Sequence, residues 1–158
     1  MKKIKTLLTA VVLLLATTAF AYSGNPKDGD NVSAKVKAAF QQDFSHASSV
    51  SWKENSDFYF ASFQLSGVSI DAAYNADGEL VGTSRKIDLD QVPLAVSLEL
   101  AKKYSGYSIY SQVTELNFEG QTSYYIDAQD NTQSLSLKCS GNGDISVDRR
   151  IKKQVVKS

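Results

Sequence analysis

The side chains that most often perform covalent chemistry are scarce in this chain. His46 is the only histidine among its 158 residues, and Cys139 is the only cysteine. A cysteine beside a histidine can act as a nucleophile, but nothing in the sequence brings these two together. Cys139 alternates with Leu135 and Leu137, which predicts a buried thiol that packs in a core. His46 is expected at the surface, near the end of a helix, where a cation is favourable.

Two acidic turns could attract a metal ion. The run Asn75–Gly78 has the composition of a calcium loop, and Gly141–Asp144 lies at the equivalent place later in the chain. The first and last ligand positions of an EF-hand would fall on Ala73 and Ser84, which breaks that pattern. We therefore predict hairpin turns and assign no metal ligand, with a weak surface calcium site as the alternative. Phosphate-binding glycine loops and the G-x-S-x-G motif are absent from the sequence, so we predict no cofactor and no enzymatic activity.

The aromatic residues are more informative. Phe58 and Phe60 alternate with Tyr59 along one predicted strand. If the Tyr59 side packs on the helices, the two phenylalanines lie on the opposite face of the sheet. The same parity places Arg85 and Tyr125 on that opposite face and Tyr124 in the core. A mixture of Phe, Tyr and Arg on an open sheet favours a protein-binding surface. The alternative is that the leader or a neighbouring subunit covers this face.

The N-terminal segment predicts export. Three lysines precede the apolar run Leu7–Ala16, and an A-x-A ending follows at Ala21. Such a segment is typical of a cleaved signal peptide over residues 1–21, and it is too short to span a membrane, which takes about 20 apolar residues. Because no cysteine lies at the junction, a lipoprotein is not predicted. The expected location is periplasmic or secreted in a bacterium. The 17 basic and 17 acidic residues argue against binding nucleic acid.

The remaining sequence predicts two similar units. A leader over residues 22–32 precedes a helix that runs from Ser33, its N-cap, to about His46. A second helix is expected to begin at Asp90, with Pro93 in its first turn, and to end at Gly106 in a left-handed conformation. The strands predicted after the first helix are 48–54, 58–65, 68–75 and 79–87. Those after the second are 108–116, 122–128, 133–139 and 144–151.

The two helices share an apolar stripe. Val36 and Phe40 in the first helix match Val96 and Leu100 at an offset of 60, and later residues match at an offset of 65. We predict one α+β domain over residues 33–151, built from tandem α-β-β-β-β repeats at 33–87 and 90–151, with helices on one face of an antiparallel sheet. Residues 152–158 form a basic tail. The cations Arg149–Lys153 would either attract an acidic partner or lipid headgroups, or protect an edge strand from aggregation.

These residues also resemble a known family. The pattern consists of an amphipathic helix ending at Phe44, followed by the segments Ala47–Trp52, Tyr59–Phe63, Ala73–Leu80 and Lys102–Tyr107. In this order they resemble the secreted PepSY-like family, also described as β-lactamase-inhibitor-like, over nearly all of the mature chain. The resemblance implies tandem helix-plus-sheet repeats in an exported protein without a catalytic centre. It also implies a concave sheet that faces a partner enzyme, or a role in holding a peptidase inactive.

The sequence thus favours an exported, non-enzymatic binding protein, an inhibitor or modulator of another envelope or secreted protein. The predicted partner-binding residues are Phe58, Phe60, Arg85 and Tyr125. The alternative is a periplasmic carrier of a small ligand or peptide, with an aromatic pocket between sheet and helices. An enzyme would require a convergent polar site that the sequence does not show.

Overall fold

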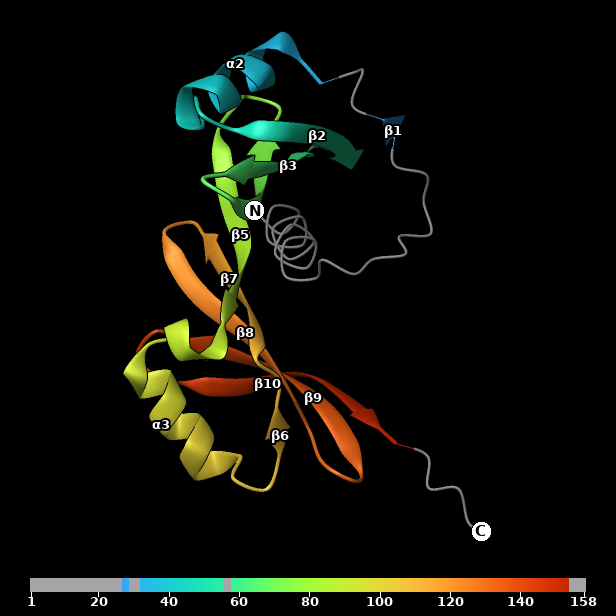
Figure 1. The fold of residues 1–158 in the computed structure, drawn as a ribbon. Coiled ribbons are helices and arrows are strands. Elements are labelled where there is room, and N and C mark those ends of the chain that lie inside the picture. The colour runs from blue at the N-terminus through green and yellow to red at the C-terminus, as the bar shows by residue number, and fades with distance from the viewer. Residues whose placement is uncertain (1–26, 29–31, 56–57, 154–158) are drawn as a thin grey trace, which may run out of the picture. The chain divides into compact units, whose positions relative to one another are not determined.

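In the part of the chain that the structure describes, the strands pair antiparallel and carry the helices α2 and α3, which confirms the predicted α+β class (Figure 1). The computed structural model describes residues 27–28, 32–55 and 58–153. Within these residues the strand order is β1-β2-β3-β4-β5-β7-β8-β9-β10, with β6 paired to β8. The chain divides into two compact units. Unit 1 comprises the residues up to Arg85 together with Asn117–Gly120, and unit 2 comprises Lys86–Leu116 and the residues from Gln121 onward.

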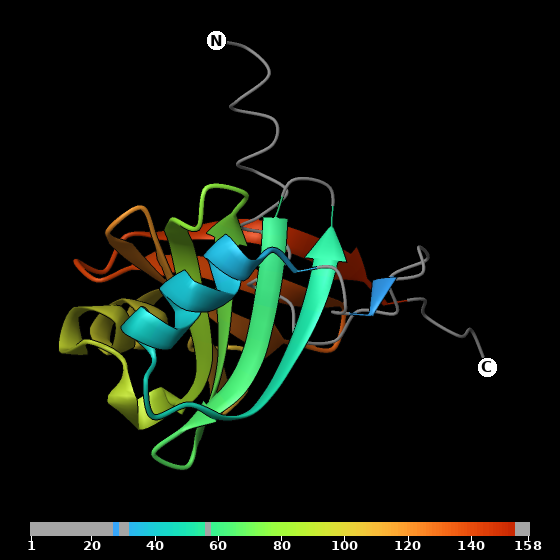
Figure 2. The ribbon, with the colours of Figure 1, turned by 90° about the horizontal axis from the view of Figure 1, so that it is seen from above.

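Unit 1 packs one helix on a meander of strands. Helix α2 (Ala34–Asp43) is followed by β2 (Ser48–Asn55), β3 (Phe58–Leu65), β4 (Val68–Asn75) and β5 (Leu80–Asp88), and the short β1 (Lys27–Asp28) pairs with β2. The part of β5 up to Arg85 belongs to this unit. Figure 2 shows α2 lying over the strands of its own unit. The predicted N-cap is confirmed, because the Ser33 hydroxyl accepts a hydrogen bond from the Val36 N–H at 3.2 Å.

The core of unit 1 is aromatic. The Phe40 ring from α2 contacts those of Trp52 and Phe63 edge-on, at centroid distances of 5.2 Å and 5.0 Å. Tyr74 is fully buried, and its hydroxyl donates to the Asp43 carboxylate at 2.8 Å. The desolvation of the ring and this bond raise the pKa of Tyr74 well above its ordinary value. The helix stripe predicted from the sequence is therefore the stripe that packs on the sheet.

Unit 2 repeats this arrangement with a largely aliphatic core. A turn of 3₁₀ helix, η2 (Leu89–Gln91), leads into α3 (Leu94–Lys103) and then into β6 (Ser108–Ile109), β7 (Gln112–Phe118), β8 (Gln121–Gln129), β9 (Gln133–Ser140) and β10 (Ile145–Lys152). Val96 and Leu100 from α3 pack on Ile126 and Leu137 from the strands. Tyr124 is 8% exposed and belongs to this core, which confirms its predicted face. Cys139 is also fully buried, as predicted.

Two glycines show how closely the units correspond. Gly78 and Gly143 occupy the turns after β4 and β9, and both have a positive φ, +75° and +95°. A Cβ on Gly78 would lie 3.3 Å from the carbonyl oxygen of Lys35 in α2, and one on Gly143 would lie 2.9 Å from that of Ala95 in α3. Each unit thus presses a glycine turn against the first turns of its own helix. Lys35 and Ala95 are 60 residues apart, and Gly78 and Gly143 are 65 apart, so the two contacts match the offsets found in the sequence.

The predicted start and end of the second helix are wrong. Asp90 lies in η2 rather than at an N-cap, and α3 begins after Pro93. The proline restricts the residue before it to extended backbone, and Val92 has ψ 154°, so a helix cannot run through this point. At the other end, Tyr104 is the C-cap and Gly106 has no positive φ.

The predicted strand 108–116 is also interrupted. It forms β6 and β7 as separate segments, with Tyr110 and Ser111 between them. The Ser111 carbonyl accepts a hydrogen bond from the Leu89 N–H at 2.7 Å, which draws this residue out of the ladder. Unit 1 carries an irregularity at the equivalent place, where the β2–β3 register shifts between Ser48 and Ser51.

A candidate binding groove on unit 2

Three strands of unit 2 present rows of side chains on the face opposite α3, which we call the outer face of unit 2. Asp127, Ser136 and Arg149 lie side by side across β8, β9 and β10. A parallel row is Gln129, Ser134 and Ile151, and another is Tyr125, Lys138 and Ser146. The residues between these rows, such as Ile126 and Leu137, point into the core instead.

A β-bulge in β10 decides which of its residues belong to this face. The register of β10 on β9 shifts between Val147 and Arg149, so Asp148 is the extra residue. Strict alternation from Ser146 would have placed Asp148 and Arg150 on the outer face. The bulge places Arg149 and Ile151 there, opposite Ser136 and Ser134. Strict alternation could not have predicted this groove, because no residue type in the run Val147–Arg149 indicates a bulge.

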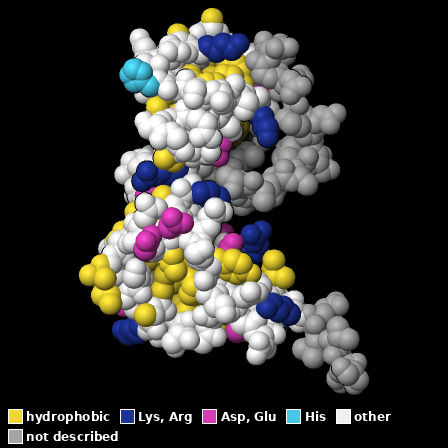
Figure 3. All heavy atoms as spheres, in the orientation of Figure 1, with side chains coloured by type: hydrophobic (Ala, Val, Ile, Leu, Met, Phe, Trp, Pro, Cys, Tyr) yellow, Lys and Arg dark blue, Asp and Glu magenta, His cyan; other side chains and the backbone are white. Residues whose placement is uncertain are grey.

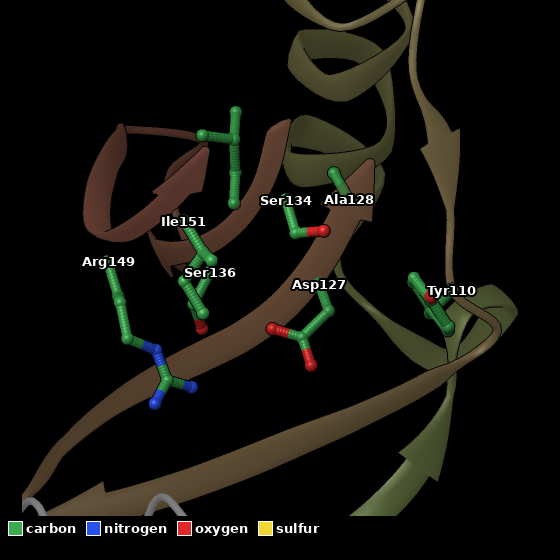
Figure 4. A pocket seen from close by; sticks show the side chains of 8 residues that line it. Tyr110, Asp127, Ala128, Ser134, Ser136, Arg149 and Ile151 are labelled. Carbon is green, nitrogen blue, oxygen red and sulfur yellow. The ribbon is translucent and has the colours of Figure 1, made fainter. Parts of the chain in front are cut away.

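The outer face of unit 2 is hollowed along its central strand. A groove of about 280 Å³ opens there. Ser134 and Ser136 on β9 are small, and larger side chains from β8 and β10 rise on both sides of them. Figure 4 shows Asp127 and Arg149 pointing into the same space from different strands. The lining residues are Tyr110, Asp127, Ala128, Ser134, Leu135, Ser136, Arg149 and Ile151.

Tyr110 reaches the groove because of the interrupted strand. Its backbone N–H donates to the Asp127 carbonyl at 2.9 Å, which holds the residue beside β8. Its side chain is 50% exposed. Ile151, at the other side of the groove, is 57% exposed. The groove thus has an aromatic and an aliphatic wall, both accessible to a partner, as binding surfaces of proteins often have.

The charges of the groove are separated. Asp127 and Arg149 both pair with Ser136, so their Cα atoms lie two strand spacings apart, roughly 10 Å. In the described part of the chain no ion pair joins them. One carboxylate and one guanidinium therefore lie on either side of the Ser136 hydroxyl, an arrangement that can bind groups of either sign.

Tyr125 lies beside the groove on the same outer face. The Lys138 ammonium is 5.9 Å from the centre of its ring, close enough for a cation–π contact. Partial burial, with a smaller contribution from the Asp148 carboxylate, raises the pKa of the Tyr125 hydroxyl to about 12. The side chain is half-buried and neutral at physiological pH, a suitable state for packing against a partner.

The other predicted site residues lie in unit 1. Phe58 and Phe60 pair with Asn75 and Ala73, on the face opposite α2, and both are partly buried. Tyr59 packs against the core, as expected. The structure therefore brings Phe58 and Phe60 together, and it places Tyr125 in the other unit.

The predicted face of Arg85 is wrong. Arg85 pairs with Ile70, whose side chain packs against the core beneath α2. The β4–β5 register shifts between Ala73 and Tyr74, so that Tyr74 pairs with Leu80 and Ala73 with Gly82. This bulge reverses the parity of β5, and Arg85 lies on the helix side of the sheet rather than with Phe60.

The two side chains considered for catalysis belong to different units, His46 to unit 1 and Cys139 to unit 2. His46 is exposed in the turn after α2, and Figure 3 shows the histidine at the surface. Burial raises the pKa of the Cys139 thiol to about 11, which suppresses the reactive thiolate. Among the described residues, no group of His, Cys, Asp and Glu could hold a metal ion.

The acidic runs form hairpin turns, as predicted. The Asn75 side-chain oxygen accepts from the backbone N–H groups of Asp77 and Glu79, at 3.0 Å and 2.9 Å. The Asn142 side chain accepts from the Asp144 N–H in the same way, at 3.3 Å.

Within the described residues, no helix is both long and apolar enough to cross a membrane.

Comparison with known proteins places the fold. No protein-family model matches the sequence, and no curated protein matches it either. A BLIP-like protein from Bacteroides fragilis is similar in structure, with a TM-score of 0.66 and 16% identity over 80% of this chain and 91% of that one. A DUF2874 family protein from Bacteroides uniformis has a TM-score of 0.65 and 22% identity over 76% and 88%. A structure described as a putative periplasmic protein from Bacteroides eggerthii has the same score and identity over 77% and 88%. At these identities the likeness shows the fold alone, and the fold of this chain is BLIP-like.

Proposed function

We propose that this chain is an exported, non-enzymatic binding protein that recognises another protein or a peptide in the bacterial envelope, as an inhibitor or modulator. The groove on the outer face of unit 2 carries this proposal. An exposed Tyr110, a half-buried Tyr125 and an exposed Arg149 surround or line it. Tyrosine and arginine contribute a disproportionate share of interface energy, because they bury large areas and lose little conformational freedom.

The location and family belong to the same proposal. Residues 1–21 have the pattern of a signal peptide and lie outside the described residues. A similar structure is described as a putative periplasmic protein, and another as BLIP-like. Both descriptions agree with the resemblance of the sequence to the secreted PepSY-like, β-lactamase-inhibitor-like family. We propose that the chain is a member that works outside the cytoplasm.

Phe58 and Phe60 form a second proposed contact area, on the face of the unit 1 strands opposite α2. They are adjacent on that face of β3, and both are partly exposed. Arg85 is no longer part of it, because it lies on the helix side.

The carrier alternative has less support. It needs a cavity among the aromatic side chains between sheet and helix. In unit 1 these rings fill that space, with Phe44 and Phe63 centred 4.7 Å apart and Phe40 and Phe63 5.0 Å apart. The groove described above opens on the other side of the sheet, in unit 2. A ligand held between sheet and helix would have to displace the core.

Capture of a partner from periplasmic extract tests the proposal. The bait is the mature protein, compared with the variants Tyr125→Ser and Arg149→Ala. We expect each variant to keep the melting temperature of the natural protein. Each should bind the captured partner more weakly, by about 1–3 kcal/mol. Leu98→Ser is the matched control, because Leu98 is 60% exposed on α3, away from the outer face. Its binding should be unchanged.

Two outcomes would contradict the proposal. Equal binding by all variants would show that the outer face of unit 2 is not the contact surface. Native mass spectrometry that finds a copurifying small molecule and no protein partner would favour the carrier. Tyr124→Ser serves as the stability reference, since Tyr124 lies in the core and its loss should lower the melting temperature.

A further inference from the structure

Strand β10 is the last in the strand order. Among the described strands it pairs only with β9, so its other edge is paired with none of them. At the opposite end of the order, β2 is paired with the short strand β1. An unpaired edge presents backbone N–H and C=O groups that can pair with an added strand.

The hydrogen bonds at both ends of the β9–β10 hairpin show which groups point outward. The Ser140 N–H donates to the Asp144 carbonyl at 2.9 Å, and the Lys153 N–H donates to the Thr132 carbonyl at 2.8 Å. In an antiparallel ladder the bonded residues alternate, so Ile151 directs its backbone groups toward β9. The N–H and C=O groups of Arg150 and Lys152 therefore point away from the sheet.

The charge of this edge is basic. Arg149, Arg150, Lys152 and Lys153 lie within or directly after the end of β10, and all are exposed. Lys153 is engaged, since its ammonium donates to the Asp130 carbonyl at 2.6 Å. Arg149 faces the groove on the outer face, and Arg150 and Lys152 lie on the other face, opposite Leu135 and Gln133. Cations thus flank the open edge on both faces of the sheet.

We propose that the β10 edge binds an extended, acidic segment of the protein partner as an additional strand. The inference rests on the proposed function and names the kind of partner segment. Its backbone would pair with the outward groups of Arg150 and Lys152. Its carboxylates would meet those two side chains on one face of the sheet, while the side chains that alternate with them would point to the other face, toward the groove beside Ile151.

A capped peptide in which Glu alternates with Val, of the length of β10, is the probe. Its binding to the mature protein is measured by fluorescence anisotropy. A copy with Lys in place of Glu should bind at least about tenfold more weakly, because the charges then repel. A Glu peptide with N-methyl groups on alternate backbone amides keeps its charge but lacks the N–H groups that would bond the edge. Its affinity should therefore fall by a similar factor.

Protein variants locate the site. The double variant Arg150→Glu with Lys152→Glu should bind the acidic peptide about tenfold more weakly than the natural protein does. Lys37→Glu reverses a single charge on an exposed residue of α2, and as a control it should leave binding unchanged. Melting curves of all variants establish that the fold is intact.

Several results would overturn the inference. Equal affinity for the Glu and Lys peptides would remove the charge argument. Full affinity of the methylated peptide would show that the backbone edge is not used. Partner capture that depends on Tyr125 and Arg149 but survives in the double variant would refute the edge site and leave the proposed function standing. Absence of binding by either peptide would show that the cations only keep edge strands of neighbouring molecules apart.

Discussion

At the residue scale, the environment of Cys139 decides its reactivity. The thiol is 0% exposed in the core of unit 2, and burial raises its pKa to about 11. Because the thiolate is the reactive form, the folded protein should not react with Ellman's reagent at about pH 8. After unfolding in guanidinium chloride the same thiol should react completely. Rapid labelling of the folded protein would show that Cys139 is accessible and that its packing role is wrong.

The same burial makes the fold sensitive to alkaline pH. The pKa values of Cys139 and Tyr125 are raised to about 11 and about 12, and that of Tyr74 is raised further. Groups whose pKa is higher in the folded state stabilise it fully below their unfolded pKa, and this contribution is lost as pH rises through the folded value. We expect the urea midpoint to fall steeply between about pH 9 and 11. The urea midpoint of the Cys139→Ala variant should fall less steeply over this range. An equal slope would show that ionisation of Cys139 does not contribute to the loss of stability.

Side-chain faces could be predicted from the sequence only as far as the strands stay regular. Alternation correctly placed Tyr59 and Tyr124 toward the cores. It failed for Arg85, because the bulge between β4 and β5 reverses the parity beyond it. The bulge in β10 likewise brought Arg149 to the groove without any signal in the sequence. A bulge depends on how two strands pair, and the sequence of one strand does not determine that pairing.

At the element scale, each helix is held by a few large residues on its inner face. Phe40 and Leu100 are each 5% exposed, at equivalent positions of α2 and α3. Phe40→Ala and Leu100→Ala should each lower the free energy of unfolding by about 2–5 kcal/mol, because they leave cavities. Lys37→Gln on the exposed side of α2 should change it by less than about 0.5 kcal/mol. Equal losses at Phe40 and Lys37, measured by urea denaturation, would show that the helix faces are misassigned.

The turn after β9 depends on the absence of a side chain. Gly143→Ala combines a positive φ of +95° with a contact of 2.9 Å between the new Cβ and the Ala95 carbonyl oxygen. Gly120 has a φ of +75°, and a Cβ added there would have nothing within 4 Å, so Gly120→Ala isolates the backbone strain. Gly120→Ala should cost about 1 kcal/mol, and Gly143→Ala clearly more, since α3 must also move. Thermal melts of the two variants provide the test, and equal losses would mean that the turn does not press on α3.

Helices and most strands could be predicted because their periodicity is strong, whereas their ends were less secure. Ser33 was correctly identified as an N-cap, because its hydroxyl accepts a hydrogen bond from the Val36 N–H in the first turn of α2. Asp90 was not a cap, because Pro93 excludes helical backbone at Val92. The gap between β6 and β7 depends on a hydrogen bond from Leu89, a residue distant in sequence, and local patterns could not reveal it.

At the scale of the whole molecule, the division of the chain differs from the predicted repeats. The turn Asn117–Gly120 of the β7–β8 hairpin belongs to unit 1, and the rest of that hairpin belongs to unit 2. The Glu119 N–H donates to the Val81 carbonyl at 3.4 Å within unit 1. A repeat cut out at residue 87 would therefore lack part of unit 1. Repeats in the sequence mark equivalent residues, while compact units depend on which segments pack together.

Export would change the molecule that meets a partner. Cleavage after Ala21 would remove Lys2, Lys3 and Lys5, three of the 17 basic residues, and none of the 17 acidic ones, leaving a net charge of about −3. Against this acidic background, the cations at the end of β10 would be the more distinctive feature of the surface.

Mass measurement of the protein recovered from the periplasm tests this processing, with Tyr22 expected as the new N-terminus. Ala21→Leu places a large residue at the predicted cleavage position and should leave the precursor uncut, because signal peptidase requires a small side chain there. Ala10→Leu, within the apolar run, is the matched control and should be processed normally. An exported protein that retains Met1 would refute the signal peptide, and with it the envelope location on which the proposed partner depends.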